Sequence, residues 1–268
     1  MNAQRTGRAS IRILVGLAAA VLLIVPALAH FQMLIPSRAV VGADDPKTVT
    51  LDLIFSHPMA MEGHMVDMVK PKAFGVSIKG GEPVDLLGTL KEKKVGKYST
   101  WTTTYRIRRP GDYVFYVEPE PRWRPPGDCF VIFYTKVVVN ALGLEEGWDT
   151  ELGLETEIVP LVRPYGLWAG NVFRGIVKRD GEPVPFAEIK VEYYNEPGAK
   201  AVEPPTKAHM TQVSKANKDG EFSYAMPKAG WWGFAALSEA DYTLKTKDGE
   251  DKSVQLRALI WVHTDEMK

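Results

Sequence analysis

The distribution of hydrophobic residues along the chain most constrains its fold. Residues 47–57 (KTVTLDLIFSH) alternate apolar and polar side chains, which is the period of a β-strand with one buried face. Residues 99–108 and 111–119 are predicted to form two further strands around the Pro110-Gly111 turn. Residues 129–140 are apolar on both faces, as expected of a central strand. Because no long stretch has the 3.6-residue period of an amphipathic helix, the sequence predicts an all-β protein.

The second half of the chain repeats a strand–turn–strand arrangement. Asp180-Gly181 and Asp219-Gly220 each separate two apolar segments, and Asp-Gly is a favoured hairpin turn. The polar, proline-containing stretch 195–218 between these hairpins is predicted to be a long loop. This order predicts a prealbumin-like or carboxypeptidase-regulatory-like β-sandwich over residues 166–268, after an N-terminal β-sandwich over residues 30–160.

The beginning of the chain has a different character. Three arginines precede a charge-free apolar run that closes with Ala27-Leu28-Ala29. A positive start, a hydrophobic middle and small residues before the cleavage point are typical of a secretory signal peptide. We therefore expect residues 1–29 to be removed on export to the periplasm. The mature chain has no later apolar stretch long enough to span a membrane. The alternative is an uncleaved N-terminal helix that anchors the protein in the membrane.

Charge and motifs exclude several classes of protein. The sequence has 33 basic and 33 acidic residues, so no basic excess indicates nucleic-acid binding. The only cysteine, Cys129, cannot form an internal disulfide, and a thiol in an apolar strand is usually inert. The motifs His-Glu-x-x-His and Gly-x-Ser-x-Gly and glycine-rich nucleotide loops are missing from the sequence. The sequence therefore predicts a binding protein rather than an enzyme, and no small-molecule substrate is inferred.

Residue types that bind metals gather in the segment 56–68 (SHPMAMEGHMVDM). His57 and His64 lie seven residues apart, where a predicted strand ends. Imidazole nitrogens suit nickel, copper and zinc, and thioethers suit copper(I). Weaker candidate ligands in this segment are Met59, Met65 and Asp67. The alternative interpretation is that a His-Pro pair ends the strand and that the methionines pack against a sheet edge.

His30 adds a second kind of ligand. If cleavage follows Ala29, His30 carries a free α-amine beside its imidazole, and the two nitrogens can close a chelate ring on one metal ion. An α-amine with a pKa of about 7.7–8.0 needs little driving force to deprotonate. Amine and imidazole nitrogens are typical ligands of tetragonal Ni²⁺ or Cu²⁺. The predicted metal ligands are therefore His30, His57 and His64, and His263, after the last predicted strand, is a weaker, distant candidate.

Four segments resemble a family of bacterial periplasmic proteins linked to nickel uptake. They are AHFQMLIPS, FSHPMAMEGHMVDM, EIVPLVRPYGLWAGNVFRGIVKRDGEPVPFAEIKVEYYN and DGEFSYAMPKAGWWGFAAL. Members of this family are regarded as accessory periplasmic components of energy-coupling-factor nickel transporters, and many are described only as a domain of unknown function. The resemblance implies two β-sandwich domains and a protein that captures Ni²⁺ and delivers it to membrane nickel transporter subunits.

Three other interpretations remain open. A mature N-terminal histidine and a methionine-rich loop on a β-sandwich also resemble copper-resistance proteins, so the chain is alternatively a periplasmic copper carrier, and by affinity alone copper would win at such a site. A copper-dependent polysaccharide oxygenase is less favoured, because it needs a flat aromatic substrate face, whereas Trp231 and Trp232 are expected in the core. The last interpretation is a structural sandwich without metal.

Overall fold

The alternating segment 47–57 forms β3 (Thr48–Ser56), as predicted. Its residues Val49, Leu51 and Leu53 are fully buried, because alternate side chains of a strand share one face. β3 pairs antiparallel on both sides within a small sheet of order β1-β3-β7-β6. The other strands of this sheet are β1 (Phe31–Pro36), β6 (Lys91–Val95) and β7 (Tyr98–Arg106).

A large central sheet runs through the molecule, which is described by a computed structural model over residues 30–61 and 64–267. The predicted signal peptide lies outside these residues. The order of the main strands is β16-β15-β18-β19-β10-β8-β4-β5. They are β4 (Ala73–Ile78), β5 (Val84–Asp85), β8 (Gly111–Glu118), β10 (Cys129–Ala141), β15 (Glu188–Tyr193), β16 (Gln212–Lys215), β18 (Gly230–Lys245) and β19 (Asp251–Asp265). Short strands β2 (Val40–Val41) and β9 (Arg122–Arg124) add to β10, and β12 (Leu167–Trp168) adds to β19.

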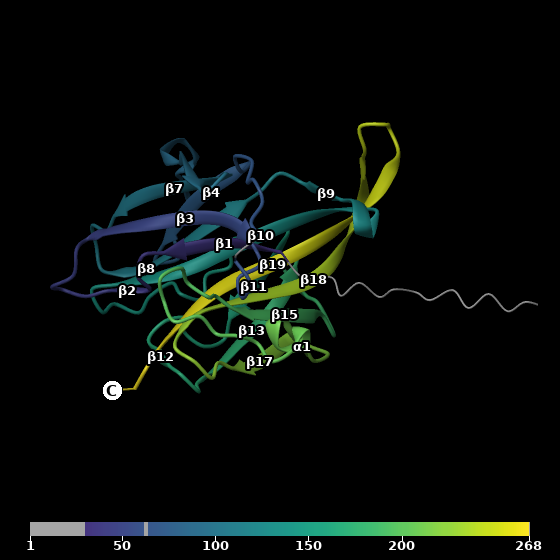
Figure 1. Cartoon of the computed structure of the whole chain (residues 1–268). Coiled ribbons are helices and arrows are strands. Elements are labelled where there is room, and N and C mark those ends of the chain that lie inside the picture. The colour runs from purple at the N-terminus through teal and green to yellow at the C-terminus, as the bar shows by residue number, and fades with distance from the viewer. Residues whose placement is uncertain (1–29, 62–63, 268) are drawn as a thin grey trace, which may run out of the picture.

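A second small sheet covers the opposite side of the central sheet. It has the order β11-β13-β14, with β17 paired to β13. Its strands are β11 (Thr156–Pro160), β13 (Val172–Arg179), β14 (Glu182–Pro183) and β17 (Glu221–Ala225). Figure 1 shows the purple and blue strands β1, β3 and β7 on one side of β10, β18 and β19, and the green strands β13 and β17 on the other. The all-β prediction is confirmed.

Two large hydrophobic cores share the strands β18 and β19. Leu259 and Trp261 of β19 pack into the core beneath β1 and β3, whereas Ile260 and Val262 pack into the core beneath β13. β10 lies between β19 and β8, and all of its residues except Phe130 are buried, which confirms the predicted central strand. The parallel pairing of β10 with β19 joins the predicted N-terminal and C-terminal halves, so the two sandwiches have a wall in common.

The Asp180-Gly181 turn forms where it is predicted. Asp180 has a φ of 52° and Gly181 a φ of 82°, and Arg179 pairs with Glu182 across the turn. Two successive positive φ angles are the geometry of a type I′ hairpin, whose twist matches that of the flanking strands.

The polar stretch 195–218 contains more regular structure than the predicted loop. It includes one helical turn, α1 (Lys207–Met210), and the strand β16, which pairs with β15 at the edge of the central sheet. Most residues of β16 are exposed, so the strand lacks the alternation of apolar residues by which a sequence reveals a strand.

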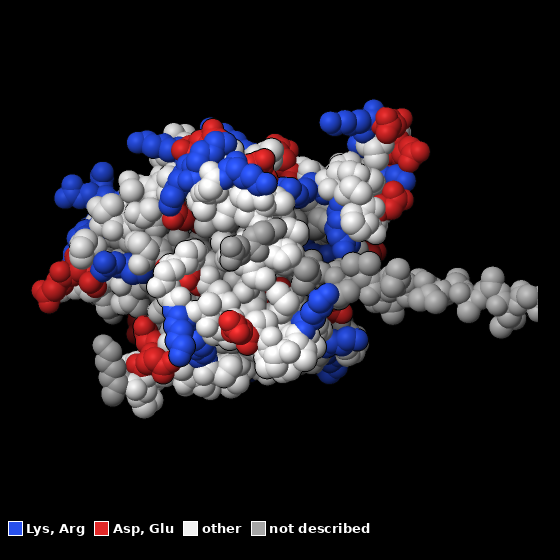
Figure 2. Space-filling view, viewed as in Figure 1, with Lys and Arg blue, Asp and Glu red and all other residues white. Residues whose placement is uncertain are grey.

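Charges of both signs are interspersed over the face of the molecule shown in Figure 2. A band of uncharged side chains crosses the middle of this face, with lysine, arginine, aspartate and glutamate around it. Over the described residues, no helix is both long and apolar enough to cross a membrane.

Candidate metal site

The register of β1 and β3 brings His30 and His57 together. Phe31 pairs with Ser56 at the end of the two antiparallel strands, so the residues just beyond that pair face each other. The ring centroids of His30 and His57 are 4.1 Å apart. His57 is 2% exposed, and the ring of His30 also stacks on Phe55 with a centroid separation of 5.4 Å. His30 and His57 are therefore neighbours in space, although the strands β1 and β3 lie between them in the sequence.

His64 returns to the same place because the segment after β3 folds back on the strand. The amide of Ala60 donates a hydrogen bond to the carbonyl of His57, and the amide of Val66 donates one to the carbonyl of Phe55, both at 3.1 Å. The ring centroids of His57 and His64 are 5.1 Å apart, with the ring planes nearly perpendicular. The structure thus gathers the three histidines that the sequence singled out.

The separations of the histidine rings can be compared with those expected of imidazoles that coordinate one metal ion. With metal–nitrogen bonds of about 2.0–2.1 Å, two imidazole centroids on one ion lie about 4.5 Å or more apart. The 5.1 Å separation meets this condition, and the 4.1 Å separation of His30 and His57 is slightly short. Within the part of the chain that the structure describes, no group of three or more His, Cys, Asp or Glu side chains is already arranged to hold a metal ion. The three rings would therefore have to move from these positions to coordinate one ion jointly.

The environment of His30 favours its neutral form. Burial lowers the pKa of His30 below its ordinary value of 6.5, and the positive charge of Arg122 lowers the pKa further. A hydrogen bond to the backbone of His64 acts in the opposite direction. Only the neutral imidazole binds a metal ion, so a lowered pKa removes the competition with protons at neutral pH.

We expect an NMR titration of the mature protein to give His30 a pKa below 6.5, the ordinary histidine value. The new α-ammonium group at the same residue adds another positive charge and lowers the pKa further. In the variant Arg122→Met, the pKa of His30 should rise toward 6.5. A pKa of His30 above 6.5 in the unsubstituted protein would contradict this description of the site.

The methionine candidates lie in the two large hydrophobic cores that share β18 and β19. Met59 packs into the core beneath β13, and Met65 packs into the core beneath β1 and β3. The two thioethers are thus separated between the cores, and each is about 8–9% exposed. This arrangement agrees with the interpretation in which the methionines of the segment are packing residues.

Asp67 and His263 have other partners. The exposed Asp67 accepts a hydrogen bond from the amide of Ser99 at 2.7 Å through Oδ1. His263 lies on β19, where its ring contacts Trp231 with a centroid separation of 4.9 Å, and its Nδ1 is 3.7 Å from the carboxylate of Asp265. The described ring contacts connect His30, His57 and His64 but do not connect His263 to them.

Comparison with protein families identifies the family of this chain. A family model described as "Domain of unknown function (DUF4198)" matches residues 27–240, which is most of the chain. The chain belongs to the DUF4198 family. The matched region includes all three clustered histidines of this DUF4198 protein. No curated protein matches its sequence.

Solved structures give only distant likenesses to this DUF4198 protein. The D0-D1 domain of Intimin is 11% identical with a TM-score of 0.24, and the match spans 88% of this chain and 100% of that chain. The trypsin-activated alpha-2-macroglobulin from Escherichia coli is 8% identical with a TM-score of 0.25, over 90% of this chain and 16% of that chain. A putative carbohydrate binding protein from Bacteroides uniformis is 11% identical with a TM-score of 0.22, over 74% and 90%. At such TM-scores these likenesses carry no argument about function.

The segment just after His57 is held in place by residues from the second half of this DUF4198 protein. These residues were not identified from the sequence alone. Oε2 of Glu192 accepts a hydrogen bond from the amide of Met59 at 3.4 Å, and Thr211 donates to the same carboxylate. Asn195 donates from its side chain to the carbonyl of Met59 at 2.7 Å and from its backbone amide to the carbonyl of Pro58 at 3.0 Å. The second sandwich therefore fixes the segment just after His57.

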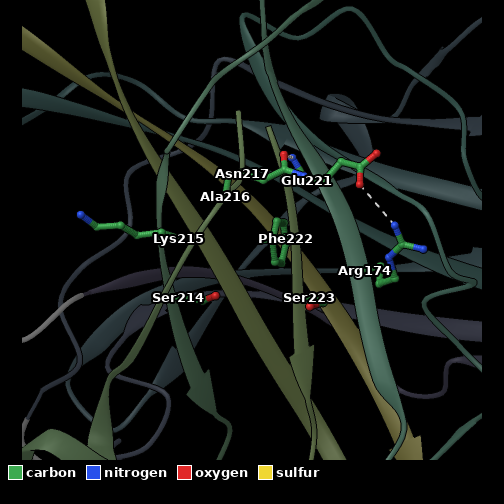
Figure 3. A pocket seen from close by; sticks show the side chains of 8 residues that line it. All are labelled: Arg174, Ser214, Lys215, Ala216, Asn217, Glu221, Phe222 and Ser223. Carbon is green, nitrogen blue, oxygen red and sulfur yellow. Dashed lines mark hydrogen bonds and ion pairs between the residues drawn. The ribbon is translucent and has the colours of Figure 1, made fainter. Parts of the chain in front are cut away.

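A separate hollow of about 310 Å³ lies on the second half of the DUF4198 protein, between β16 and β17. Figure 3 shows Arg174 and Glu221 directed at each other in this hollow and Lys215 pointing away from the other side chains. The guanidinium of Arg174 and the carboxylate of Glu221 are 3.3 Å apart, so each neutralises the other. None of the predicted metal ligands lines this hollow, and we therefore place the candidate site at the histidines.

Proposed function

We propose that this DUF4198 protein captures Ni²⁺ in the periplasm and delivers it to the subunits of a membrane nickel transporter. The observation that carries the proposal is the set of neighbouring rings of His30, His57 and His64, with centroid separations of 4.1 and 5.1 Å. The position of His30 directly after Ala27-Leu28-Ala29 supports the proposal, because this is where cleavage of the predicted signal peptide would fall. Export would turn His30 into an N-terminal residue with two metal-binding nitrogens.

The donor set suits a carrier. An α-amine and imidazoles are neutral ligands, so the bound ion keeps its charge and is held by nitrogen lone pairs alone. His30 and His64 are partly exposed, whereas His57 is buried. A partner protein can therefore reach two ligands of the ion and replace them one at a time during transfer.

Copper is the second candidate cargo. Cu²⁺ binds nitrogen ligands more tightly than Ni²⁺ does, so the donor set by itself favours copper. Thioether coordination of Cu(I) is less well supported, because Met59 and Met65 are buried in different cores. The preference for nickel therefore rests on the resemblance of the sequence to nickel-uptake proteins.

Titration of the mature protein, beginning at His30, with Ni²⁺ tests the proposal. We expect one ion to bind per chain, and one additional methionine before His30 to weaken binding roughly tenfold or more, because it removes the chelating amine. His57→Ala should weaken binding similarly. His209→Ala is the matched control, because His209 is exposed on α1 and should have no effect. Equal affinity of the extended and mature proteins for Ni²⁺ would refute the chelate, and absence of Ni²⁺ binding would refute the function.

A further inference from the structure

A cavity of about 340 Å³ lies beside the three histidines. Phe55 forms part of its wall and at the same time stacks on His30, so the cavity adjoins the candidate metal site directly. Other apolar residues in its lining are Met68, Trp123 and Phe133. Cavities that bind small molecules have volumes from about 300 Å³ upward and mostly apolar walls with a few polar groups. The cavity has the size and lining of a small-molecule site.

Arg122 supplies the cavity with a positive charge. Its guanidinium lies over the ring of Phe55 at 4.7 Å from the centroid, and it donates a hydrogen bond to the backbone carbonyl of Asp67 at 3.2 Å. Among residues 30–61 and 64–267, no carboxylate forms an ion pair with Arg122, although Asp67 and Glu120 also line the cavity. A partly buried guanidinium with unused donors is suited to bidentate binding of a carboxylate.

The positive charge of Arg122 also lies close to the candidate metal site. The guanidinium of Arg122 lies over Phe55, and the ring of His30 stacks on the same Phe55, so this positive charge stands close to the position where a metal ion would bind. Amine and imidazole ligands are neutral, so they leave the two charges of Ni²⁺ uncompensated next to Arg122. The charge of Arg122 opposes a bare dication, whereas Asp67 and Glu120 in the cavity lining attract it, and a carboxylate paired with Arg122 would offset the opposing charge.

We propose that the cavity binds a small organic carboxylate that coordinates the same Ni²⁺, so that the protein binds a metal–carboxylate complex more tightly than the bare ion. This inference rests on the proposed function. One carboxylate of the ligand pairs with Arg122, a second donor group completes the coordination of the ion beside His30, and the carbon skeleton packs against Phe55. The ligand class is therefore a small chelating acid, such as a hydroxy-carboxylate or an amino acid.

The test uses the mature protein, ⁶³Ni²⁺ and three probes, citrate, malate and L-histidine, each in radiolabelled form. After gel filtration, we expect the protein to retain Ni²⁺ and at least one of these carboxylates in equal amounts, and the carboxylate to require Ni²⁺ for retention. Arg122→Met should weaken binding of the complex tenfold or more. The same variant should bind bare Ni²⁺ a few-fold more tightly, because one repelling charge is removed.

Two further variants separate the role of Arg122 from a general effect on folding. Arg122→Lys keeps the charge but loses the bidentate donor geometry, so it should weaken binding of the complex less than Arg122→Met. Arg174→Met removes an arginine of the other hollow and should change neither binding reaction. If bare Ni²⁺ binds but no probe is retained, or if Arg122→Met retains the complex fully, this inference falls and the proposed function stands. If the protein binds neither bare Ni²⁺ nor a complex, both fall.

Discussion

Replacement of Lys136 by methionine should lower the free energy of unfolding by about 3–5 kcal/mol. Nζ of Lys136 lies 2.6 Å from Oε2 of Glu157, and the two side chains are only 2% and 5% exposed. Glu157 also accepts hydrogen bonds from the backbone amides of Leu152 and Gly153. The substitution leaves a buried carboxylate without its cation, which costs far more than the loss of a single exposed contact.

The location of this ion pair increases its importance for the fold. Lys136 belongs to β10 of the central sheet, and Glu157 belongs to β11 of the second small sheet. Burial lowers the pKa of Lys136, and the negative charge of Glu157 and its hydrogen bond with Lys136 oppose this effect. The pair thus connects two layers of the molecule at a place where neither charge can reach water.

Urea denaturation followed by tryptophan fluorescence measures the effect. Lys245→Met is the matched control, because Lys245 pairs with Asp251 while the two side chains are 67% and 57% exposed. Exposed pairs contribute about 0–1 kcal/mol. The double variant Lys136→Met, Glu157→Leu should recover much of the lost stability, because it removes both buried charges. If Lys136→Met costs no more than Lys245→Met, the pair is not the constraint that we describe.

Replacement of Glu192 by glutamine should stabilise the protein at pH 8 and leave its stability at pH 4.5 nearly unchanged. Burial raises the pKa of Glu192 from 4.5 to about 7, against the opposing effects of its hydrogen bonds with Thr211 and Met59. The folded protein therefore binds this proton more tightly than the unfolded chain does. The resulting stabilisation is complete below pH 4.5 and is lost as the pH rises to about 7.

The size of this effect follows from the shift of the pKa. One unit corresponds to about 1.4 kcal/mol, so the ionised Glu192 lowers the free energy of unfolding by on the order of 3 kcal/mol above pH 7. Glutamine is neutral at every pH. Its oxygen can still accept the hydrogen bond from the amide of Met59, and its amino group can donate to Thr211. The variant should thus retain the local geometry without the charge.

Thermal unfolding between pH 4.5 and pH 8 tests this prediction. The difference in free energy of unfolding between Glu192→Gln and the unsubstituted protein should grow with pH and level off above about pH 7. Glu239→Gln on the partly exposed part of β18 serves as a control and should show no such growth. A constant difference across this range would mean that Glu192 does not carry the raised pKa.

Local periodicity accounts for much of the fold that could be predicted. β3, β7, β8 and β10 lie where alternating or fully apolar segments were found, because the period of side chains along a strand is a local property. The pairing of β10 with β19, which joins the two halves of the chain in one sheet, was not predictable in the same way. Phe130 pairs with Val254, and no local pattern reports a pairing between residues so far apart in the sequence.

The candidate site was predictable only in part. The histidines were found by residue type and by the position of His30 after a cleavage motif. Glu192 and Arg122 were not identified from the sequence as residues that contact the candidate site, for two different reasons. Alternation along β15 puts Glu192 on the polar face, which the histidine segment then covers. Arg122 lies in a short strand that has no sequence signal of its own, and only its place over Phe55 gives it a role.

The sequence by itself determined where most strands and turns form and which residues carry metal-binding side chains, and it predicts that export would create a free amine at His30. These properties depend on the chemistry and period of neighbouring residues. The tertiary structure alone decided that the rings of His30, His57 and His64 are neighbours, that two of the hydrophobic cores share β18 and β19, and that Arg122 stands beside the candidate metal site. These relations arise from the register of paired strands and from burial, which depend on parts of the chain that are distant in sequence.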